Sequence, residues 1–272
     1  MSDPGLPAWS LPDHERTRIE IELEWPERVT ADWAFGGSTG RGVRVCILDS
    51  GIEGGHRLVG QVEQAVAVIA AGDGYEVVED EDGDPCGHGT ACAGIVRSLA
   101  PECTLHSVRV LGAGYTGSGE ILLAGLEWAV AQGFDVINMS LSTTKSKFAH
   151  VLHDLADDAY FGRTIVVASA HNMPVASYPW RFSSVVSVGS HEDSDPRLLL
   201  ANPSPPVEFF ARGVDVDVAW PGGGTLRCTG NSFAAPHVSG LCALALAKHP
   251  RLAPYQLKSV LYLTAANVGG GR

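Results

Sequence analysis

Apolar positions along the chain follow two periods, one typical of buried strands and one typical of helices. Residues 43–48 form a nearly continuous apolar run, VRVCIL, which predicts a strand of a parallel sheet buried on both faces. Residues 120–132 carry apolar side chains at helical spacing instead. By the same criteria, further strands are predicted at 105–111, 135–141, 164–170 and 184–190, and further helices at 88–100, 148–161, 232–249 and 253–265. This alternation predicts an α/β fold in which a mostly parallel sheet has helices on both faces.

The beginning of the chain lacks this rhythm. Residues 1–40 contain Pro, Glu and Trp with little periodicity, and we expect them to form an extended arm that wraps the domain. We place an N-terminal extension at 1–30 and a single domain at 31–272, since no repeat or linker interrupts the later pattern. A chain of 272 residues, 45% of them apolar, is sufficient for one domain with a sizeable core.

The composition argues against several classes of partner. The formal net charge of −12 argues against nucleic acid and against an anionic membrane surface, because both require clustered Lys and Arg. The first residues, MSDPGLPAWS, have neither the basic nor the apolar part of a secretory signal. The longest apolar runs, such as LCALALA at 241–247, are too short to span a membrane. We therefore expect a cytoplasmic protein.

Cysteine usage agrees with this location. None of the cysteines forms a C-x-x-C pair, and three of them fall in strongly apolar segments, where a thiol behaves as a small buried side chain. The six are Cys46, Cys86, Cys92, Cys103, Cys228 and Cys242. We expect all of them to be reduced thiols.

Three segments carry residues suited to nucleophilic hydrolysis. Asp49 directly follows the strand at 43–48, His88 lies between two glycines at a helix start, and Ser232 opens a long apolar helix. Each alone has an ordinary structural explanation, as a turn residue, a structural histidine or a helix cap. Together they supply a carboxylate to orient a base, the base itself and a nucleophile. The helix start adds N–H donors for an oxyanion.

The same segments resemble the motifs of the subtilisin-like (subtilase) family, in the same order along the chain. They appear here as Asp49-Ser50-Gly51, His88-Gly89-Thr90 and Gly230-Asn231-Ser232-Phe233-Ala234-Ala235-Pro236-His237. The order Asp, His, Ser separates this family from α/β-hydrolases and from chymotrypsin-like enzymes. The intervening segments VRVLGAG, GLEWAVAQGFDVINMSL and VVASAHN also look like subtilisin core segments. The resemblance covers about residues 30–265.

The resemblance implies a three-layer subtilisin-like fold and a serine endopeptidase acting on peptide or protein substrates, with no cofactor and no metal. It implies that Asp49, His88 and Ser232 form a catalytic triad and that Asn172 is the side-chain donor of the oxyanion hole. It also implies two segments that flank an extended substrate, and a specificity pocket beside them. The residues implied in substrate binding are Gly114, Tyr115, Thr116, Gly117, Ser140, Leu141, Ser142, Ser169 and His171.

The chain departs from the family pattern near the expected pocket. His171 and the pair Ser142-Thr143 stand where the family has glycines, which implies a pocket that is smaller or more polar than that of a broad digestive protease. Asn231 and Phe233 replace the Thr and Met beside the nucleophile. The short stretch at 97–107 lacks the loop that carries the strong calcium site of secreted members. We expect a processing protease that trims a precursor or leader peptide and works without calcium.

Two other glycine-rich patterns match known motifs, but their neighbouring strands and helices do not fit those motifs. GGSTG at 36–40 lacks the flanking strand and helix of a nucleophile elbow. GAGYTG at 112–117 fits a dinucleotide-binding loop, but Asp135 begins the next strand, whereas the acidic residue that binds ribose lies at a strand's end.

Metal sites are also disfavoured. DEDGDP at 80–85 has Pro85 where a calcium loop needs Gly. Zinc on Cys86, His88 and Cys92 would lack a fourth ligand and would consume the base.

Two alternatives stay open from the sequence. An inactive subtilase fold used as a binding module is the alternative to an enzyme.

The stretch at 73–84 has seven acidic residues and no basic one. It is either a solvated surface loop or a charged rim that attracts basic substrates to the cleft.

Overall fold

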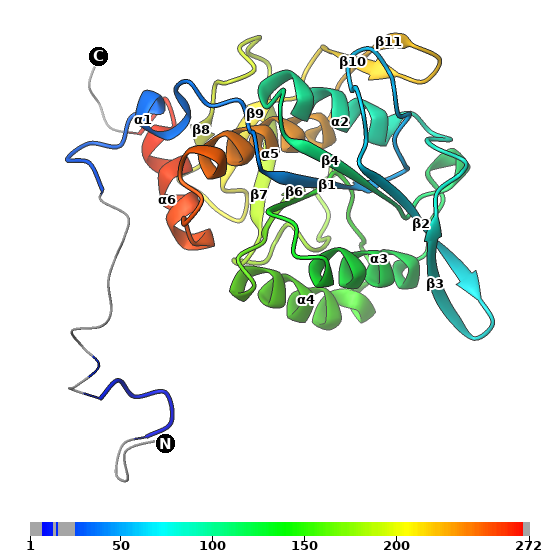
Figure 1. Cartoon of the computed structure of the whole chain (residues 1–272), viewed down its shortest axis with the longest axis horizontal. Helices are drawn as coiled ribbons and strands as arrows, with labels where there is room; N and C mark the ends of the chain where they lie inside the picture. The colour runs from blue at the N-terminus through cyan, green and yellow to red at the C-terminus, as the bar shows by residue number, and fades with distance from the viewer. Residues whose placement is uncertain (1–6, 13–14, 16–24, 269–272) are drawn as a thin grey trace.

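The computed structural model describes residues 7–12, 15 and 25–268. Within these residues, one sheet has the strand order β3-β2-β4-β1-β5-β6-β7-β9-β8 (Figure 1). Its strands are β1 Arg44–Asp49, β2 Gln64–Ala71, β3 Gly74–Glu79, β4 Thr104–Arg109, β5 Val136–Met139, β6 Ile165–Ser169, β7 Val186–His191, β8 Leu200–Ala201 and β9 Phe209–Arg212. Neighbouring strands are parallel, except that β3 and β8 at the two edges are antiparallel to their neighbours. The mostly parallel sheet is therefore as predicted.

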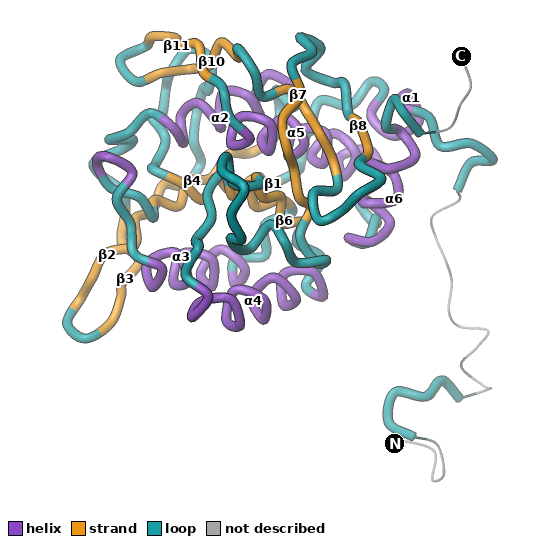
Figure 2. The backbone as a smooth tube through the Cα atoms, turned by 180° about the vertical axis from the view of Figure 1, so that it is seen from behind, coloured by secondary structure: helices purple, strands orange, loops and turns teal. Residues whose placement is uncertain are grey.

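Helices cover both faces of this sheet. The helices are α1 Ala31–Phe35, α2 His88–Leu99, α3 Gly119–Ala131, α4 Ala149–Phe161, α5 Asn231–Lys248 and α6 Pro254–Thr264. Helices α3 and α4 lie on one face, and α2 and α5 lie on the other; Figure 2 shows the same layers from behind. A separate antiparallel pair, β10 Val216–Trp220 and β11 Gly224–Cys228, lies beside α2. The three-layer α/β fold is confirmed.

Strand β1 shows why its sequence is apolar at every position. Val45 and Ile47 face the core shared with α2 and α5, whereas Cys46 and Leu48 face the core shared with α3 and α4. All four side chains are fully buried. A strand between two helical layers has no solvent face, so alternation disappears. The same strand ends at Asp49, which it delivers to the carboxyl edge of the sheet.

All ten predicted helices and strands are present, with ends that agree to within a few residues. The antiparallel hairpin of β2 and β3, the short helix α1 and the strands β8 to β11 were not predicted. Strand β3, GYEVVE, is mostly exposed, so it lacks the apolar run that marks a buried strand. The acidic stretch at 73–84 is therefore a strand followed by a loop, and not a loop throughout.

Part of the expected N-terminal arm packs on the domain. The Trp33 ring stacks on His249, with 4.1 Å between ring centroids. Lys248 Nζ donates to the carbonyls of Asp32 and Gly36 at 2.7 and 3.0 Å. Residues 1–6, 13–14 and 16–24 of the arm lie outside the described residues. The boundary between an extension at 1–30 and a domain at 31–272 stays a prediction.

All six cysteines lie in the described part of the chain, and none of them is joined in a disulfide. Burial raises the pKa of Cys103 to about 11 and that of Cys242 to about 12, so these thiols stay protonated. Among the described residues, no helix has both the length and the apolar character needed to cross a membrane.

Candidate active site

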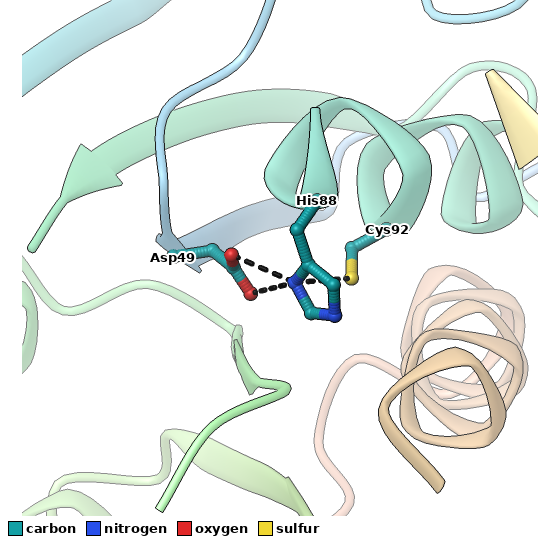
Figure 3. Close-up of side chains that lie close together, drawn as sticks. All are labelled: Asp49, His88 and Cys92. Atoms are coloured by element: carbon teal, nitrogen blue, oxygen red, sulfur yellow. Dashed lines mark hydrogen bonds and ion pairs between the residues drawn. The ribbon is translucent and has the colours of Figure 1, made fainter. Parts of the chain in front are cut away.

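Asp49 and His88 meet at the carboxyl edge of the sheet. Strand β1 ends at Asp49, which has no exposed surface, and α2 begins at His88. His88 Nδ1 lies 2.8 Å from Asp49 Oδ1 and 3.0 Å from Oδ2 (Figure 3). Because a carboxylate can only accept hydrogen bonds, the proton lies on Nδ1, and Nε2 is left as the basic position.

The surroundings of His88 favour its protonated form. Burial is the largest single effect and disfavours the imidazolium, but the charge and hydrogen bond of Asp49, together with the contact with Cys92, outweigh it and raise the pKa of His88 well above its usual value. The ring also packs against Phe233, at 5.3 Å between centroids, and against Tyr115 in an edge-on contact at 5.9 Å. These two aromatic rings limit the positions that the imidazole can adopt.

A second carboxylate, Asp84, holds the segments that carry this pair. Its two oxygens accept hydrogen bonds of 2.6–3.0 Å from Ser50, Cys86, Gly87 and Thr90. The Ser50 hydroxyl in turn accepts the N–H of Gly89 at 3.0 Å. The residues on both sides of His88 and the residue after Asp49 are therefore linked to one carboxylate. A signal in the sequence could have revealed it, because an acidic residue lies just before a helix that starts without a side-chain cap.

Two further acidic residues of the 73–84 stretch are paired within the protein. Arg109 Nε lies 3.0 Å from Asp80 Oδ1, and Arg109 Nη2 lies 2.9 Å from Asp82 Oδ2. With Asp84 engaged at α2, three of the seven acidic side chains have internal partners. The charge available to attract a basic substrate is therefore smaller than the sequence suggested.

Ser232 is the second residue of α5, and the preceding glycine leaves space beside its hydroxyl. A Cβ added to Gly230 would lie 3.3 Å from Ser232 Oγ and 3.4 Å from Asn172 Nδ2, so the hydroxyl and the amide border the same space. Asn172 Oδ1 accepts the N–H of Asn231 at 2.9 Å, which leaves Nδ2 as a donor. Within the described residues, no hydrogen bond joins the Ser232 hydroxyl to His88. Such bonds are often long until substrate is bound.

Cys92 lies between the pair of Asp49 and His88 on one side and Ser232 on the other. Its Sγ is 3.9 Å from His88 Nδ1 and 3.7 Å from the carbonyl oxygen of Ser232. Ligand atoms of Asp49, His88 and Cys92 lie within 4.8 Å of one another, a set of oxygen, nitrogen and sulfur that could hold zinc. Burial raises the pKa of Cys92, so its thiol is protonated when no metal is bound. Cys86, considered as a ligand from the sequence, donates instead to the carbonyl of Gly112 at 2.9 Å.

Asn231, the residue before Ser232, links α5 to two neighbouring segments. Its Oδ1 accepts hydrogen bonds from the N–H and the hydroxyl of Ser190 on β7, both at 2.9 Å. Its Nδ2 donates to the carbonyl of His171 at 3.3 Å. The asparagine that looked like a mere departure from the family motif therefore links the start of α5 to the segment that carries Asn172.

The segment after β5, expected to flank the substrate, has side chains that contact other parts of the protein. Ser140 is buried, and its hydroxyl donates to the carbonyl of Ser232 at 2.7 Å. Leu141 packs against the core on the α3 and α4 face. Ser142 Oγ donates to Ser177 Oγ at 3.1 Å, and the backbone of the next residue pairs with Tyr178. The side chain of Ser140 is thus directed to the backbone of Ser232.

The opposite segment is extended only in part. Gly114 and Tyr115, with φ of 69° and 60°, lie in the 3-10 turn Ala113–Tyr115, whereas Thr116 is extended. These residues and Gly117 are exposed. The role of this segment as a substrate edge stays a prediction.

The segment that carries Asn172 borders a cavity. Ser169 ends β6 and is buried, and His171 follows at the rim. A cavity of about 400 Å³ is lined by His171, Met173, Val175, Trp180 and Arg181 among others.

Comparison with known proteins gives one consistent result. The model of the subtilase family matches residues 40–272. Subtilisin DY of Bacillus licheniformis is 34% identical over 251 residues, which cover 86% of this chain and 87% of that protein. Alkaline elastase YaB of Bacillus sp. (strain YaB) is 31% identical over 279 residues, which cover 98% of this chain and 71% of that protein. The crystal structure of a cold adapted subtilisin-like serine proteinase matches with a TM-score of 0.68 and 29% sequence identity, over 82% of each chain.

Proposed function

The chain belongs to the subtilase family and is a serine endopeptidase, and on this premise we propose that Ser232 is its nucleophile, His88 its general base and Asp49 the carboxylate that orients the base. The observation that carries this proposal is the pairing of His88 Nδ1 with Asp49 at 2.8 Å, which leaves Nε2 to act on a hydroxyl. Peptides or proteins are the substrates.

In the proposed mechanism, Ser232 Oγ attacks the scissile carbonyl while His88 Nε2 takes its proton. Asp49 stabilises the imidazolium that forms, and His88 then donates the proton to the leaving amine. Asn172 Nδ2 and the backbone N–H of Ser232 donate hydrogen bonds to the oxyanion. The space shared by Ser232 Oγ and Asn172 Nδ2 beside Gly230 supports this arrangement. A side-chain donor of this kind contributes about 3–4 kcal/mol of transition-state stabilisation.

We further propose that the cleft selects small side chains before the scissile bond. Ser142 Oγ and Trp180 Nε1 both donate to the hydroxyl of Ser177, at 3.1 and 2.7 Å, and these groups occupy space beside the segment after β5. A narrow pocket supports a processing role, such as trimming a precursor or leader peptide, over general digestion. The unpaired cysteines support a cytoplasmic location for this role.

Covalent labelling tests the triad. A fluorophosphonate probe should label the wild-type protein at one serine and should not label Ser232→Ala. An inactive binding module, the alternative function, predicts no labelling of either protein.

A peptide library tests the pocket. Peptides with Gly, Ala or Ser before the scissile bond should be cleaved faster than matched peptides with Phe or Leu. Ser142→Gly should reduce that preference, because it removes one of the side chains that narrow the pocket. Equal cleavage of small and bulky peptides by the wild-type enzyme would refute the selectivity but not the triad.

A further inference from the structure

The start of α5 contains a proline that removes one helical hydrogen bond. Pro236 stands four residues after Ser232, where a backbone N–H would normally donate to the carbonyl of Ser232. Proline has no N–H, so this carbonyl requires a donor from elsewhere. The helix itself therefore supplies no hydrogen bond to the carbonyl of the proposed nucleophile.

Two side chains from other elements supply donors to this carbonyl. The hydroxyl of Ser140, just after β5, donates to Ser232 O over 2.7 Å. The thiol of Cys92, on α2, approaches the same oxygen at 3.7 Å. A hydroxyl is the stronger donor of the two, because a thiol donates only weakly. Ser140 is 5% exposed, so bulk water competes little for the bond.

A buried polar chain fixes the direction of the Ser140 hydroxyl. Asn138 Nδ2 donates to Ser140 Oγ at 3.0 Å, which leaves the hydroxyl hydrogen for Ser232. Asn138 Oδ1 accepts the hydroxyl of Ser239 at 2.9 Å. Asn138 and Ser239 have no exposed surface. Ser239 lies about two turns beyond Ser232 on α5, so the chain attaches β5 to the helix at two points.

We propose that Ser140 is a positioning residue for the nucleophile: its hydroxyl replaces the helical donor that Pro236 lacks and fixes the backbone of Ser232. This inference rests on the proposed role of Ser232. A backbone that is free to shift carries the hydroxyl away from His88, and a displacement of about 1 Å can lower a rate about 100-fold.

The test compares two buried serines whose hydroxyls both donate to a backbone carbonyl. Ser140→Ala removes the hydrogen bond to the carbonyl of Ser232. The control is Ser187→Ala, on strand β7, which removes a hydrogen bond of 2.9 Å to the carbonyl of Pro206. The measurements are the rate of fluorophosphonate labelling, kcat and KM for one peptide, and hydrogen exchange of residues 229–235. Ser140→Cys retains a weaker donor and provides an intermediate case.

Ser140→Ala should label roughly 10- to 100-fold more slowly and lose kcat by a similar factor, with KM within about twofold of wild type. Ser140→Cys should fall between Ser140→Ala and wild type, and Ser187→Ala should label at the wild-type rate. Hydrogen exchange at 229–235 should be faster in Ser140→Ala alone.

Three outcomes would overturn the inference: labelling of Ser140→Ala at the wild-type rate, an equal loss in Ser187→Ala, or a higher KM with unchanged labelling, which indicates a substrate contact. If the wild-type protein itself fails to label, the proposed triad is wrong. Hydrogen exchange still tests the role of Ser140 in that case. If residues 229–235 exchange at the wild-type rate in Ser140→Ala, Ser140 does not fix the backbone of Ser232.

Discussion

Asp49 and His88, on one side of the active site, are held by carboxylate groups, whereas Ser232 and Asn172, on the other side, are held by neutral hydroxyl, amide and thiol groups. Asp84 accepts hydrogen bonds both from the residue after Asp49 and from the start of the helix that carries His88. Among the described residues, the carbonyl of Ser232 has a hydroxyl and a thiol as donors, and Asn172 pairs with a backbone N–H.

The activity should therefore depend on pH through the contacts around His88, and on geometry alone through the contacts around Ser232. Charged contacts depend on pH and on the protonation of a partner, so changes near His88 should alter both rate and pH dependence. Neutral hydrogen bonds depend on geometry, so changes near Ser232 should alter rate while the pH dependence stays the same. Each prediction below tests one side of this division.

The largest effect is expected where the two halves act together. Ser232→Ala and His88→Ala should each lower kcat by about 10⁶-fold, because nucleophile and base act as a unit. The double variant should be no slower than either single variant, which single-turnover kinetics on a chromogenic peptide can measure. Additive losses would show that the two residues act independently.

On the charged side, Asp49→Asn should lower kcat by about 10⁴-fold and change its pH dependence. His88 must be neutral to act as a base, and Asp49 raises its pKa, so wild-type activity falls as pH drops through that raised value. Without the charge the pKa of His88 falls, and the acidic limb of kcat/KM should move to lower pH. An unmoved limb would contradict the electrostatic role of Asp49.

The same pair gives a stability prediction with a definite sign. The pKa of His88 is higher in the folded protein than in the unfolded chain, where it is about 6.5. The pair therefore stabilises the fold fully below pH about 6.5, and this contribution is lost as pH rises through the folded value. In thermal melts, the Tm advantage of wild type over Asp49→Asn should be larger in acid than at alkaline pH.

On the neutral side, Asn172→Ala should lower kcat by about 10²- to 10³-fold with little change in KM. The oxyanion forms only in the transition state, so substrate binding is spared. The pH profile, measured on the same peptide, should keep its shape, because no titrating group is lost. A shifted acidic limb would break the proposed division between the two halves.

The smallest effect is expected for Asp84→Asn. An amide can accept on only one atom, so part of the contact with Thr90 or with the residues before His88 is lost, at about 1–3 kcal/mol of unfolding free energy. We expect roughly a tenfold loss in kcat, with the Tm lowered and the acidic limb moved in the same direction as in Asp49→Asn. A matched control is Asp135→Asn, whose carboxylate accepts the N–H of Arg44 away from the site. It should lower Tm and leave the pH profile unchanged.

Much of this architecture could be predicted from the sequence because its signals are local. The run at 43–48 marks a strand buried between two layers, and it delivers Asp49 to the sheet edge as expected. The order of the three motifs gave the residues of the proposed triad. The edge hairpin of β2 and β3 could not be predicted in this way, since its exposed positions hide the strand period.

The roles of Asp84 and Ser140 could not be assigned from the sequence for a different reason. Asp84 stood in an acidic stretch that looked like solvated surface, and Ser140 stood on a segment expected to meet the substrate. Their hydrogen bonds join segments 34 and 92 residues apart, which no local period records. Two hints were available: an acidic residue just before a helix that starts at a glycine, and a proline inside a helix, which implies an unpaired carbonyl four residues earlier.

Helix α5 has a consequence for the time at which activity can begin. It starts at Asn231, after all the strands described, and packs against the central strands β5, β6 and β7. A ribosome releases the chain in order, so Asp49 and His88 emerge well before Ser232, and contacts between distant segments form late in folding. A nascent chain therefore carries the proposed base before it carries the proposed nucleophile. The proposed triad is therefore incomplete in each chain until α5 docks on the sheet.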